Sequence, residues 1–216
     1  ANYIAYWDFD SDARDKSGNM NHASLEGTTI RSSYGISDGY VDYGIYNYSF
    51  VALPQINLNA AQEFTIGVWV YDQNGVAPNE SPYFFYGDED YGWLGITKYP
   101  NLTDEECDLA FSVGAKGTAD SLNPLIVHYE HAYANNWVFY CMTYDRGQIK
   151  AYINGRLKGE MDQQVSYTPD THGALGKYWK DNQSEIHFSG KMDEVFIHKM
   201  ALSESQIKEI YKKFTE

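Results

Sequence analysis

The fold is decided by residues 137–155, whose sequence is WVFYCMTYDRGQIKAYING. Two runs within it, Trp137–Tyr144 and Ile149–Ile153, are rich in the aromatic and β-branched residues that suit pleated, half-buried strands. The second run alternates polar and apolar side chains, as an antiparallel strand with one buried face does. Gly147 lies between the runs and can adopt the positive φ of a hairpin loop, while Asn154-Gly155 is the strongest hairpin signal in the chain. The stretch therefore predicts antiparallel hairpins.

Runs of the same kind continue along the chain in both directions, separated by Gly, Asn, Asp and Pro. They predict further strands at Tyr3–Phe9, Tyr40–Tyr43, Phe64–Tyr71, Tyr83–Tyr86, Leu94–Lys98, Leu109–Val113, Leu125–Tyr129, Ile186–Phe188 and Met192–His198. Less regular stretches at 72–92, 99–107, 114–124 and 162–185 are predicted to be long loops. Since a rigid sandwich positions its loops for binding, we expect ligand contacts to concentrate there.

A single helix is predicted near the C-terminal end, over Ser203–Lys213. Ser203 and Gln206 form a capping box, and two lysines lie in the last turn, where the helix dipole favours positive charge. An apolar stripe can pack against the sandwich, and it consists of Leu202, Ile207, Ile210 and Tyr211. These elements predict an all-β fold with one short helix. The 216 residues fit one domain, 1–216, because β-sandwiches often reach about 200–250 residues undivided.

Composition limits the classes of partner. The formal net charge of −14 repels phosphate groups, which argues against nucleic acid and anionic membranes and favours a cation. No apolar run approaches the ~18–20 residues needed to insert across a bilayer, and the first residues lack the basic and apolar segments of a signal peptide. The 20 Tyr and 5 Trp residues suit strand packing, and some are candidates for stacking on a sugar ring.

Two cysteines, Cys107 and Cys141, allow one disulfide with a single connectivity. Two buried thiols are the alternative, since a reduced cysteine behaves as a small apolar residue. The sequence leaves both arrangements open. The histidines show no zinc-ligand spacing among themselves or with the cysteines, so zinc is not expected.

Three blocks of sequence are similar to motifs of one family. Residues 6–10 (YWDFD) and 15–22 (DKSGNMNH) are similar to its W-x-F-D strand and D-x-S-G-N-x-x-H loop, and residues 64–70 (FTIGVWV) to its aromatic strand. Residues 137–155 and 188–207 are similar to its W-x-x-V-x-x-T-Y-D, Y-x-N-G and F-x-G-x-I-D-E-V-R-I-Y blocks. In this order the blocks resemble the laminin G-like branch of the concanavalin A-like lectin/glucanase superfamily. The resemblance implies a two-sheet antiparallel jelly-roll sandwich, whereas function varies across lectins, carbohydrate-binding modules, adhesion domains and enzymes.

The resemblance also implies a calcium ion, because laminin G-like domains often hold one on the sandwich. Asp10 ends the opening strand motif and Asp193 lies in the last strand, and the first and last strands of this fold usually pair. Their carboxylates, with carbonyl oxygens near residues 38–40 and Asp38 as a further side-chain candidate, would satisfy a cation that takes about six to eight oxygen ligands. The alternative is that Asp10 and Asp193 only hydrogen-bond turn amides. The expected ion is structural.

Sugar recognition needs an aromatic face and planar polar groups, and residues 86–93 (YGDEDYGW) and 177–182 (KYWKDN) supply both. We predict that four rings stack on a sugar and that three polar side chains hydrogen-bond it. The rings are Tyr91, Trp93, Tyr178 and Trp179, and the polar side chains are Asp88, Asp90 and Asn182. A core position is the alternative for Trp93, which lies beside two aliphatic residues, whereas Trp179 lies among charged residues and is expected to be exposed.

Catalysis is not predicted. Glycoside hydrolysis normally needs two carboxyl groups across the scissile bond. The glucanases of this superfamily carry them as E-x-D-x-x-E on one strand, a spacing that the chain lacks. Glu89 or Glu130 in an unrecognised pair is the remaining catalytic alternative, and His187 is interpreted as a packed strand residue.

The sequence therefore predicts a non-catalytic, lectin-like module that binds a glycan or polysaccharide and belongs to a secreted or cell-surface protein. A protein-interaction or adhesion domain that uses the same loops is the second hypothesis. The two hypotheses differ in surface shape, because a sugar needs a concave aromatic groove and a protein partner a flatter patch.

Overall fold

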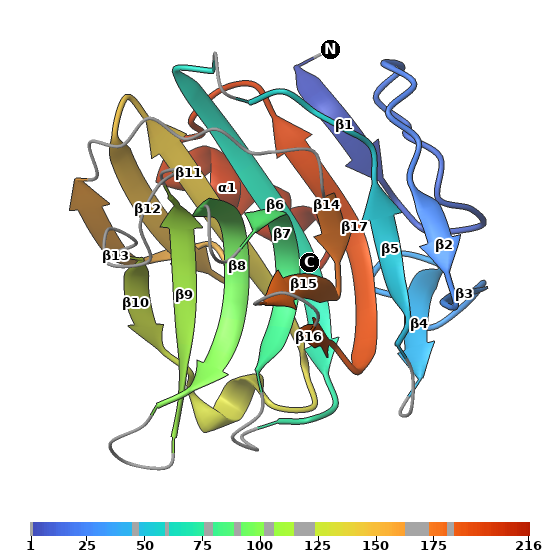
Figure 1. Ribbon diagram of the computed structural model, residues 1–216. Helices are drawn as coiled ribbons and strands as arrows, with labels where there is room; N and C mark the ends of the chain where they lie inside the picture. The colour runs from blue at the N-terminus through green and yellow to red at the C-terminus, as the bar shows by residue number, and fades with distance from the viewer. Residues whose placement is uncertain are drawn as a thin grey trace.

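The chain folds into two antiparallel β-sheets that pack face to face, with one helix behind them (Figure 1). This computed structural model describes residues 2–44, 48–58, 61–75, 80–88, 92–101, 106–114, 124–162, 173–180 and 184–216. Every strand predicted from the sequence overlaps an observed strand, so the prediction of an all-β, two-sheet sandwich is confirmed.

Within the described residues, the first sheet has eight strands. Their order is β13 (Arg156–Asp162), β12 (Gln148–Ile153), β11 (Trp137–Asp145), β6 (Glu63–Asp72), β17 (Gly190–His198), β4 (Tyr40–Gly44) and β3 (Thr29–Arg31), and β1 (Tyr3–Trp7) pairs with β17. The predicted hairpin of residues 137–155 is β11–β12, where Asp145 pairs with Gln148 across the turn.

The second sheet has seven strands in the described part of the chain. Their order is β10 (Leu125–His128), β9 (Cys107–Val113), β8 (Gly92–Pro100), β7 (Ser81–Asp88), β14 (Gly173–Leu175), β5 (Phe50–Leu53) and β2 (Ser24–Glu26). A 3-10 turn, η2 (His131–Tyr133), leads from this sheet back to the first.

The main core lies between the two sheets. Strand β6 shows why, because alternate residues point to opposite faces of a strand. Phe64, Ile66 and Val68 join the core between the sheets, whereas Trp69 belongs to a second apolar cluster on the outer face of the eight-stranded sheet.

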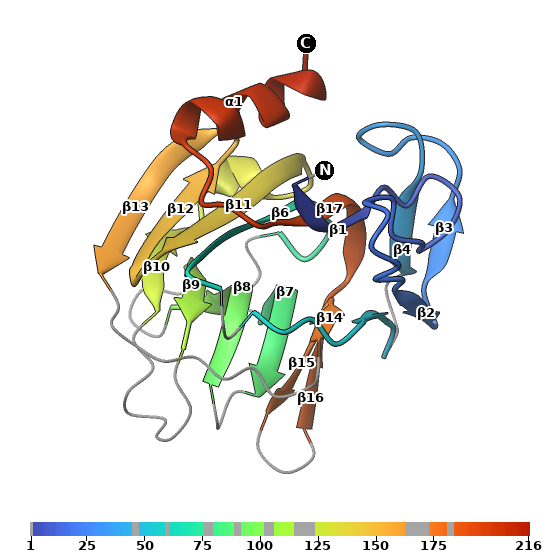
Figure 2. The same ribbon diagram turned by 90° about the horizontal axis from the view of Figure 1, so that it is seen from above.

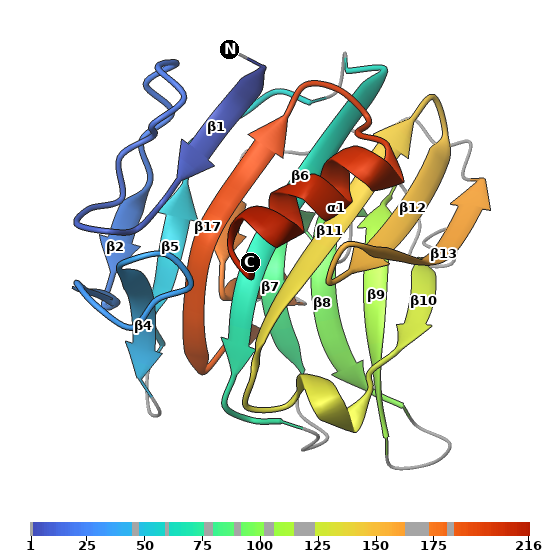
Figure 3. The ribbon, with the colours of Figure 1, turned by 180° about the vertical axis from the view of Figure 1, so that it is seen from behind.

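The helix α1 (Glu204–Lys213) covers that second cluster (Figure 3). Ser203 and Gln206 form the capping box that the sequence predicts. Ile207 is buried, and the ring of Tyr211 stacks on Trp69 with 5.6 Å between centroids. With ten residues, α1 is too short to span a bilayer, and no helix in the described ranges is long and apolar enough to do so.

The structure contains the cysteines as buried thiols, not as a disulfide. Cys107 on β9 points into the core between the sheets, whereas Cys141 on β11 lies in the cluster beneath α1. The two side chains are therefore on opposite sides of the eight-stranded sheet, and this separation explains why the disulfide alternative is not realised. Burial raises the pKa of both thiols.

The segment 162–185, predicted to be a loop, contains strand β14 and a two-stranded ribbon of β15 (Lys177–Lys180) and β16 (Ser184–His187). The ribbon packs on β7, on the face of the seven-stranded sheet that is turned away from α1 (Figure 2). We call that face the front face. The ribbon lies across its middle, with β8 to β10 on one side and β5 and β2 on the other (Figure 1).

Candidate functional site

The first candidate site is the place where β1 and β17 pair, which confirms the predicted meeting of the first and last strands. Asp10 follows β1, Asp193 lies in β17, and both contact the loop of residues 35–39. An Oδ1 atom of Asp10 accepts a hydrogen bond from the Gly39 amide at 3.0 Å. Oδ2 of Asp193 accepts one from the Ile36 amide at 2.8 Å. These bonds to loop amides match the alternative that the sequence left open for the two aspartates.

Burial distinguishes Asp193 from the other acids of this junction. Its side chain is fully buried, and the adjacent Glu194 is almost so. Burial, reinforced by the charge of Glu194, raises the pKa of Asp193 to about 8, and burial raises the pKa of Glu194 to about 7. Tyr6 donates a hydrogen bond to Glu194. No lysine, arginine or histidine among the described residues forms a salt bridge with Asp193, so its charge has no cationic partner there.

The donors at this junction fit calcium in type, because all of them are oxygens. The carbonyl oxygens of Phe9 and Asp10 approach Gly39 so closely that a Cβ atom there would lie 2.7 Å and 2.6 Å from them. Asp38 is exposed, and its carbonyl oxygen accepts a hydrogen bond from the Gly35 amide. The described ranges contain no group of three or more His, Cys, Asp or Glu side chains arranged for a metal. A calcium site here would therefore rely on carbonyl oxygens beside the carboxylates.

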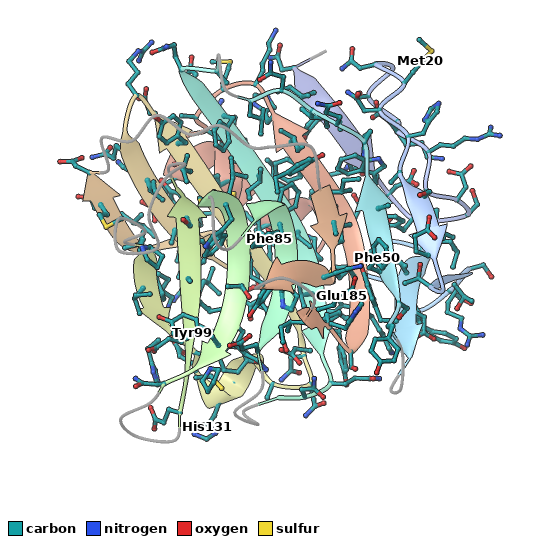
Figure 4. All side chains as sticks on the ribbon, in the orientation of Figure 1. Met20, Phe50, Phe85, Tyr99, His131 and Glu185 are labelled. Carbon is teal, nitrogen blue, oxygen red and sulfur yellow. The ribbon has the colours of Figure 1, made fainter. Side chains whose placement is uncertain are left out.

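The second candidate site is the group of aromatic residues predicted to stack on a sugar. Trp93 and Tyr178 both stack on the ring of Phe85, with centroid distances of 5.4 Å and 5.3 Å. Only 7% of Trp93 and 5% of Tyr178 is exposed. The two rings therefore pack the ribbon onto the front face and do not offer open faces to a ligand. For Trp93 this is the core position that the sequence left as the alternative. Figure 4 labels Phe85 at the centre of this cluster.

The remaining predicted contacts fall outside what the structure describes. Tyr91, Asp90 and Asn182 lie outside the described residues, as do the side chains of Asp88 and Trp179. Their predicted roles stay predictions.

A third site, which the sequence did not indicate, is a surface hollow of about 400 Å³ on the front face. We call it the Tyr48 hollow, and its lining consists of Glu26, Gly27, Tyr48, Ser49 and Phe50. Tyr48 is 84% exposed, which is unusual for an aromatic ring beside a concave surface. The ring of His187 meets that of Tyr48 edge to face with centroids 5.3 Å apart.

Charged residues of the ribbon lie against the floor of the Tyr48 hollow. The Lys177 ammonium lies 4.2 Å from the centre of the Phe50 ring and 2.8 Å from Oε1 of Glu185. Nε2 of His187 lies 3.2 Å from the other Glu185 oxygen, and its Nδ1 lies 3.5 Å from the carbonyl of Ser49. Phe50 and Glu185 accordingly appear side by side in Figure 4. His187 is thus a packed strand residue, as interpreted, and it also holds one wall of the hollow.

The surroundings of Glu130, one of the two residues of the catalytic alternative, do not suit a general acid. Glu130 accepts hydrogen bonds from Lys158 and Tyr133. These bonds hold the pKa of Glu130 below its usual value, and the bond from Lys158 has the larger effect. A general acid needs the opposite shift. Glu89 lies outside the described residues.

The fold agrees with a comparison against protein families. The model of the concanavalin A-like lectin/glucanases superfamily, in its laminin G form, matches residues 46–208. The chain belongs to this superfamily. None of the curated proteins compared with it matches the sequence.

Solved structures similar to this superfamily member include domain 4 of AbnA, a GH43 extracellular arabinanase from Geobacillus stearothermophilus, in complex with arabinotriose. Its TM-score is 0.71 at 22% identity, with 98% of each chain covered. The binding domain of botulinum neurotoxin DC is also similar, in complex with rat synaptotagmin II (TM-score 0.72, 14% identity) and with SialylT (TM-score 0.71, 15% identity). Each match covers 99% of this chain but only 52% and 51% of the toxin chains, so the chain spans about half their length. At these identities the likeness shows the shared fold.

Proposed function

We propose that this domain is a non-catalytic carbohydrate-binding module of a secreted or cell-surface protein, and that it binds glycan in the Tyr48 hollow. The observation that carries the proposal is the exposed ring of Tyr48 beside a concavity lined by polar groups. A sugar ring has an apolar C–H face that stacks on an aromatic ring, and hydroxyl groups that need hydrogen-bonding partners. The volume of about 400 Å³ lies in the range of small-ligand sites, ~300–1,000 Å³.

Each part of the hollow has a role in this proposal. Tyr48 stacks on the sugar, and the Glu26 carboxylate accepts hydrogen bonds from its hydroxyls. The ribbon supplies Glu185 at the edge, held in place by Lys177 and His187. Glu26 is the only carboxylate in the described lining, and Glu185 at the edge is bound to Lys177 and His187. The hydrogen bond from Lys177 holds the pKa of Glu185 below its usual value, which does not suit the general acid of glycoside hydrolysis.

The complex of AbnA domain 4 with arabinotriose supports a glycan partner, and the toxin domain with synaptotagmin II supports the alternative of a protein partner. The small size of the hollow favours glycan, since a protein partner would use a larger patch.

We propose in addition that a structural calcium ion binds at the junction of β1 and β17. Asp193 and Asp10 would hold it through their carboxylates, together with nearby carbonyl oxygens and Asp38 at the exposed side. The ion would supply the positive charge that the buried Asp193 lacks among the described residues. Its role is to stabilise the loop of residues 35–39 against the two strands.

The test of glycan binding is a screen of the purified domain on a broad array of polysaccharides and oligosaccharides, followed by titration of the best binder. We expect Tyr48→Ala to weaken binding about tenfold, because the loss of one aromatic stacking contact costs ~0.5–1.5 kcal/mol beyond the apolar area. Tyr34→Ala is the matched control, since Tyr34 is equally exposed and lies away from the hollow. Unchanged affinity in Tyr48→Ala would remove the hollow as the site. Silence of the folded domain on every glycan would favour a protein partner.

A further inference from the structure

The Tyr48 hollow carries a second property, its charge. Glu26 lies in the lining, opposite Phe50 in the pairing of β2 with β5. The ribbon brings Lys177 over the Phe50 ring and His187 against Tyr48, and both contact Glu185. We propose that this arrangement makes the hollow select uncharged sugars and reject acidic ones such as uronic and sialic acids. The inference rests on the proposed glycan-binding function and deepens it by naming the class of sugar.

The lysine cannot serve as the cationic partner of an acidic sugar. Only 7% of the Lys177 side chain is exposed, and its ammonium contacts Oε1 of Glu185 at 2.8 Å. The same ammonium lies 4.2 Å from the centre of the Phe50 ring, below the hollow floor. An acidic sugar would have to displace Glu185 to reach it, and would leave that carboxylate without its partner.

The accessible groups are instead acceptors with negative charge. Glu26 is exposed, and one of its oxygens accepts a hydrogen bond from the Ser24 hydroxyl. Glu185 is the other carboxylate at this edge, with 40% of its side chain exposed. With Lys177 neutralising Glu185, Glu26 carries the carboxylate charge that remains unpaired by a lysine among the described residues of the hollow. Carboxylates accept hydrogen bonds from neutral sugar hydroxyls and repel a carboxylate or sulfate placed beside them.

The charge of the whole chain acts in the same direction. A formal net charge of −14 surrounds the hollow with negative potential, so an anionic ligand is repelled before it arrives. Salt screens this repulsion over a Debye length of ~8 Å at physiological ionic strength. The discrimination is therefore expected to be strongest at low salt.

The experiment compares acidic ligands with neutral counterparts, and the closest match is trigalacturonic acid with its methyl ester. The probes are trigalacturonic acid and its methyl ester, 3′-sialyllactose and lactose, and arabinotriose, each titrated by calorimetry with the intact domain. We expect the neutral member of a pair to bind at least about fivefold more tightly at low salt, as one like charge at close range implies. Raising the salt from about 0.01 M to about 0.3 M should narrow that ratio and leave neutral binding unchanged.

Two variants locate the effect. Glu26→Gln keeps the size and the acceptor oxygen, and should reduce the neutral-to-acidic ratio at least twofold. Glu209→Gln removes the same charge from the exposed surface of α1, behind the opposite sheet, and should leave the ratio unchanged.

The outcomes separate the two proposals. Acidic probes that bind as tightly as their neutral partners would overturn the charge selection and leave the glycan site intact. An equal change of ratio in Glu26→Gln and Glu209→Gln would show that the net charge, and not the hollow, sets the preference. Failure of the folded domain to bind these probes and every glycan of the array would overturn the proposed function, and the selection with it.

Discussion

Two buried carboxylates in this protein have opposite surroundings. Asp72, at the end of β6, lies 2.7 Å from the ammonium of Lys98 on β8, and neither side chain is exposed beyond 2%. Tyr83 donates a further hydrogen bond to Asp72 at 2.8 Å, and Lys98 donates one to the carbonyl of Gly75. Asp193 is buried to the same degree, yet only backbone amides are recorded as its partners among the described residues.

The two regions differ in how the charge of the buried carboxylate is compensated. The pair of Asp72 and Lys98 is complete within the chain, so it joins the two sheets and needs nothing from outside. At the junction of β1 and β17, no salt bridge to Asp193 is formed within the described ranges, and Asp193 and Asp10 both accept hydrogen bonds from the loop of residues 35–39. A buried anion without a cation is costly, which is why we assign the calcium ion to this place and not to Asp72.

The largest effect is expected from breaking the complete pair. Lys98→Met should lower the free energy of unfolding by about 3–5 kcal/mol, because it leaves the buried charge of Asp72 without compensation. Urea denaturation followed by tryptophan fluorescence measures the loss. The double variant Lys98→Met with Asp72→Asn is the control, and it should recover much of the stability. A loss below about 1 kcal/mol in the single variant would mean that the pair contributes little.

A smaller effect on the free energy of unfolding should follow from adding calcium to the site at Asp193. Calcium at about 100 times its dissociation constant should raise the free energy of unfolding by ~2.7 kcal/mol, if it binds only the folded state. Thermal unfolding with calcium and with chelator measures the increment. Asp193→Asn should abolish it, whereas Glu209→Gln should keep it. The calcium proposal would be refuted by an equal increment in Asp193→Asn, or by none in the parent domain.

The smallest effect, counted for one carboxylate over a single pH unit, concerns the calcium-free domain. The pKa of Asp193, about 8, and that of Glu194, about 7, lie above their ordinary values of 3.8 and 4.5, so the folded state binds these protons more tightly than the unfolded state. Their contribution is therefore complete below pH ~4 and is lost as the pH rises toward 7 and 8, by up to ~1.4 kcal/mol per pH unit for each carboxylate.

The measurement for this prediction is the difference in unfolding free energy between the parent domain and Asp193→Asn, followed from about pH 5 to about pH 8 in chelator. Taking the difference removes the contribution of the other carboxylates. The parent should lose stability relative to the variant as the pH rises, and added calcium should flatten the dependence. A difference that does not vary with pH would contradict the raised pKa of Asp193.

The sequence was sufficient for the framework of the fold. The strands with apolar alternation or aromatic residues, such as β6, β11 and β17, were predicted because local pattern determines them. Strand β13, with the sequence RLKGEMD, was missed because it is an exposed edge strand with charged residues and a glycine. Strand β14 was missed because its three residues, GAL, gain their strand conformation only by pairing with β5 and β7.

The binding site was harder to predict for a related reason. The motif at residues 177–182 was predicted to contact a sugar, but its Tyr178 packs inward on Phe85. The Tyr48 hollow joins residues 26–27 and 48–50 to a ribbon that lies more than 120 residues later in the chain, as the contact of Ser49 with His187 shows (|i−j| = 138). No local spacing in the sequence indicates such a meeting, and nothing in the sequence separates Tyr48 from the other tyrosines of the chain.

The attachment of the ribbon of β15 and β16 allows an equilibrium between molecules with a docked ribbon and molecules with a lifted one. Among the described residues, its four residue pairs connect the ribbon strands only to each other. The ribbon is held on the sheet at Gly176, whose amide donates to the carbonyl of Tyr83, and by the side chains of Tyr178, Lys177 and His187. A molecule whose ribbon has lifted loses the contacts of His187 with Tyr48 and of Lys177 with Phe50, two residues that line the hollow. The apparent dissociation constant therefore equals the intrinsic one divided by the fraction of molecules with the ribbon docked. Substitutions in the Phe85 cluster, far from any sugar, would then tune affinity through that fraction alone.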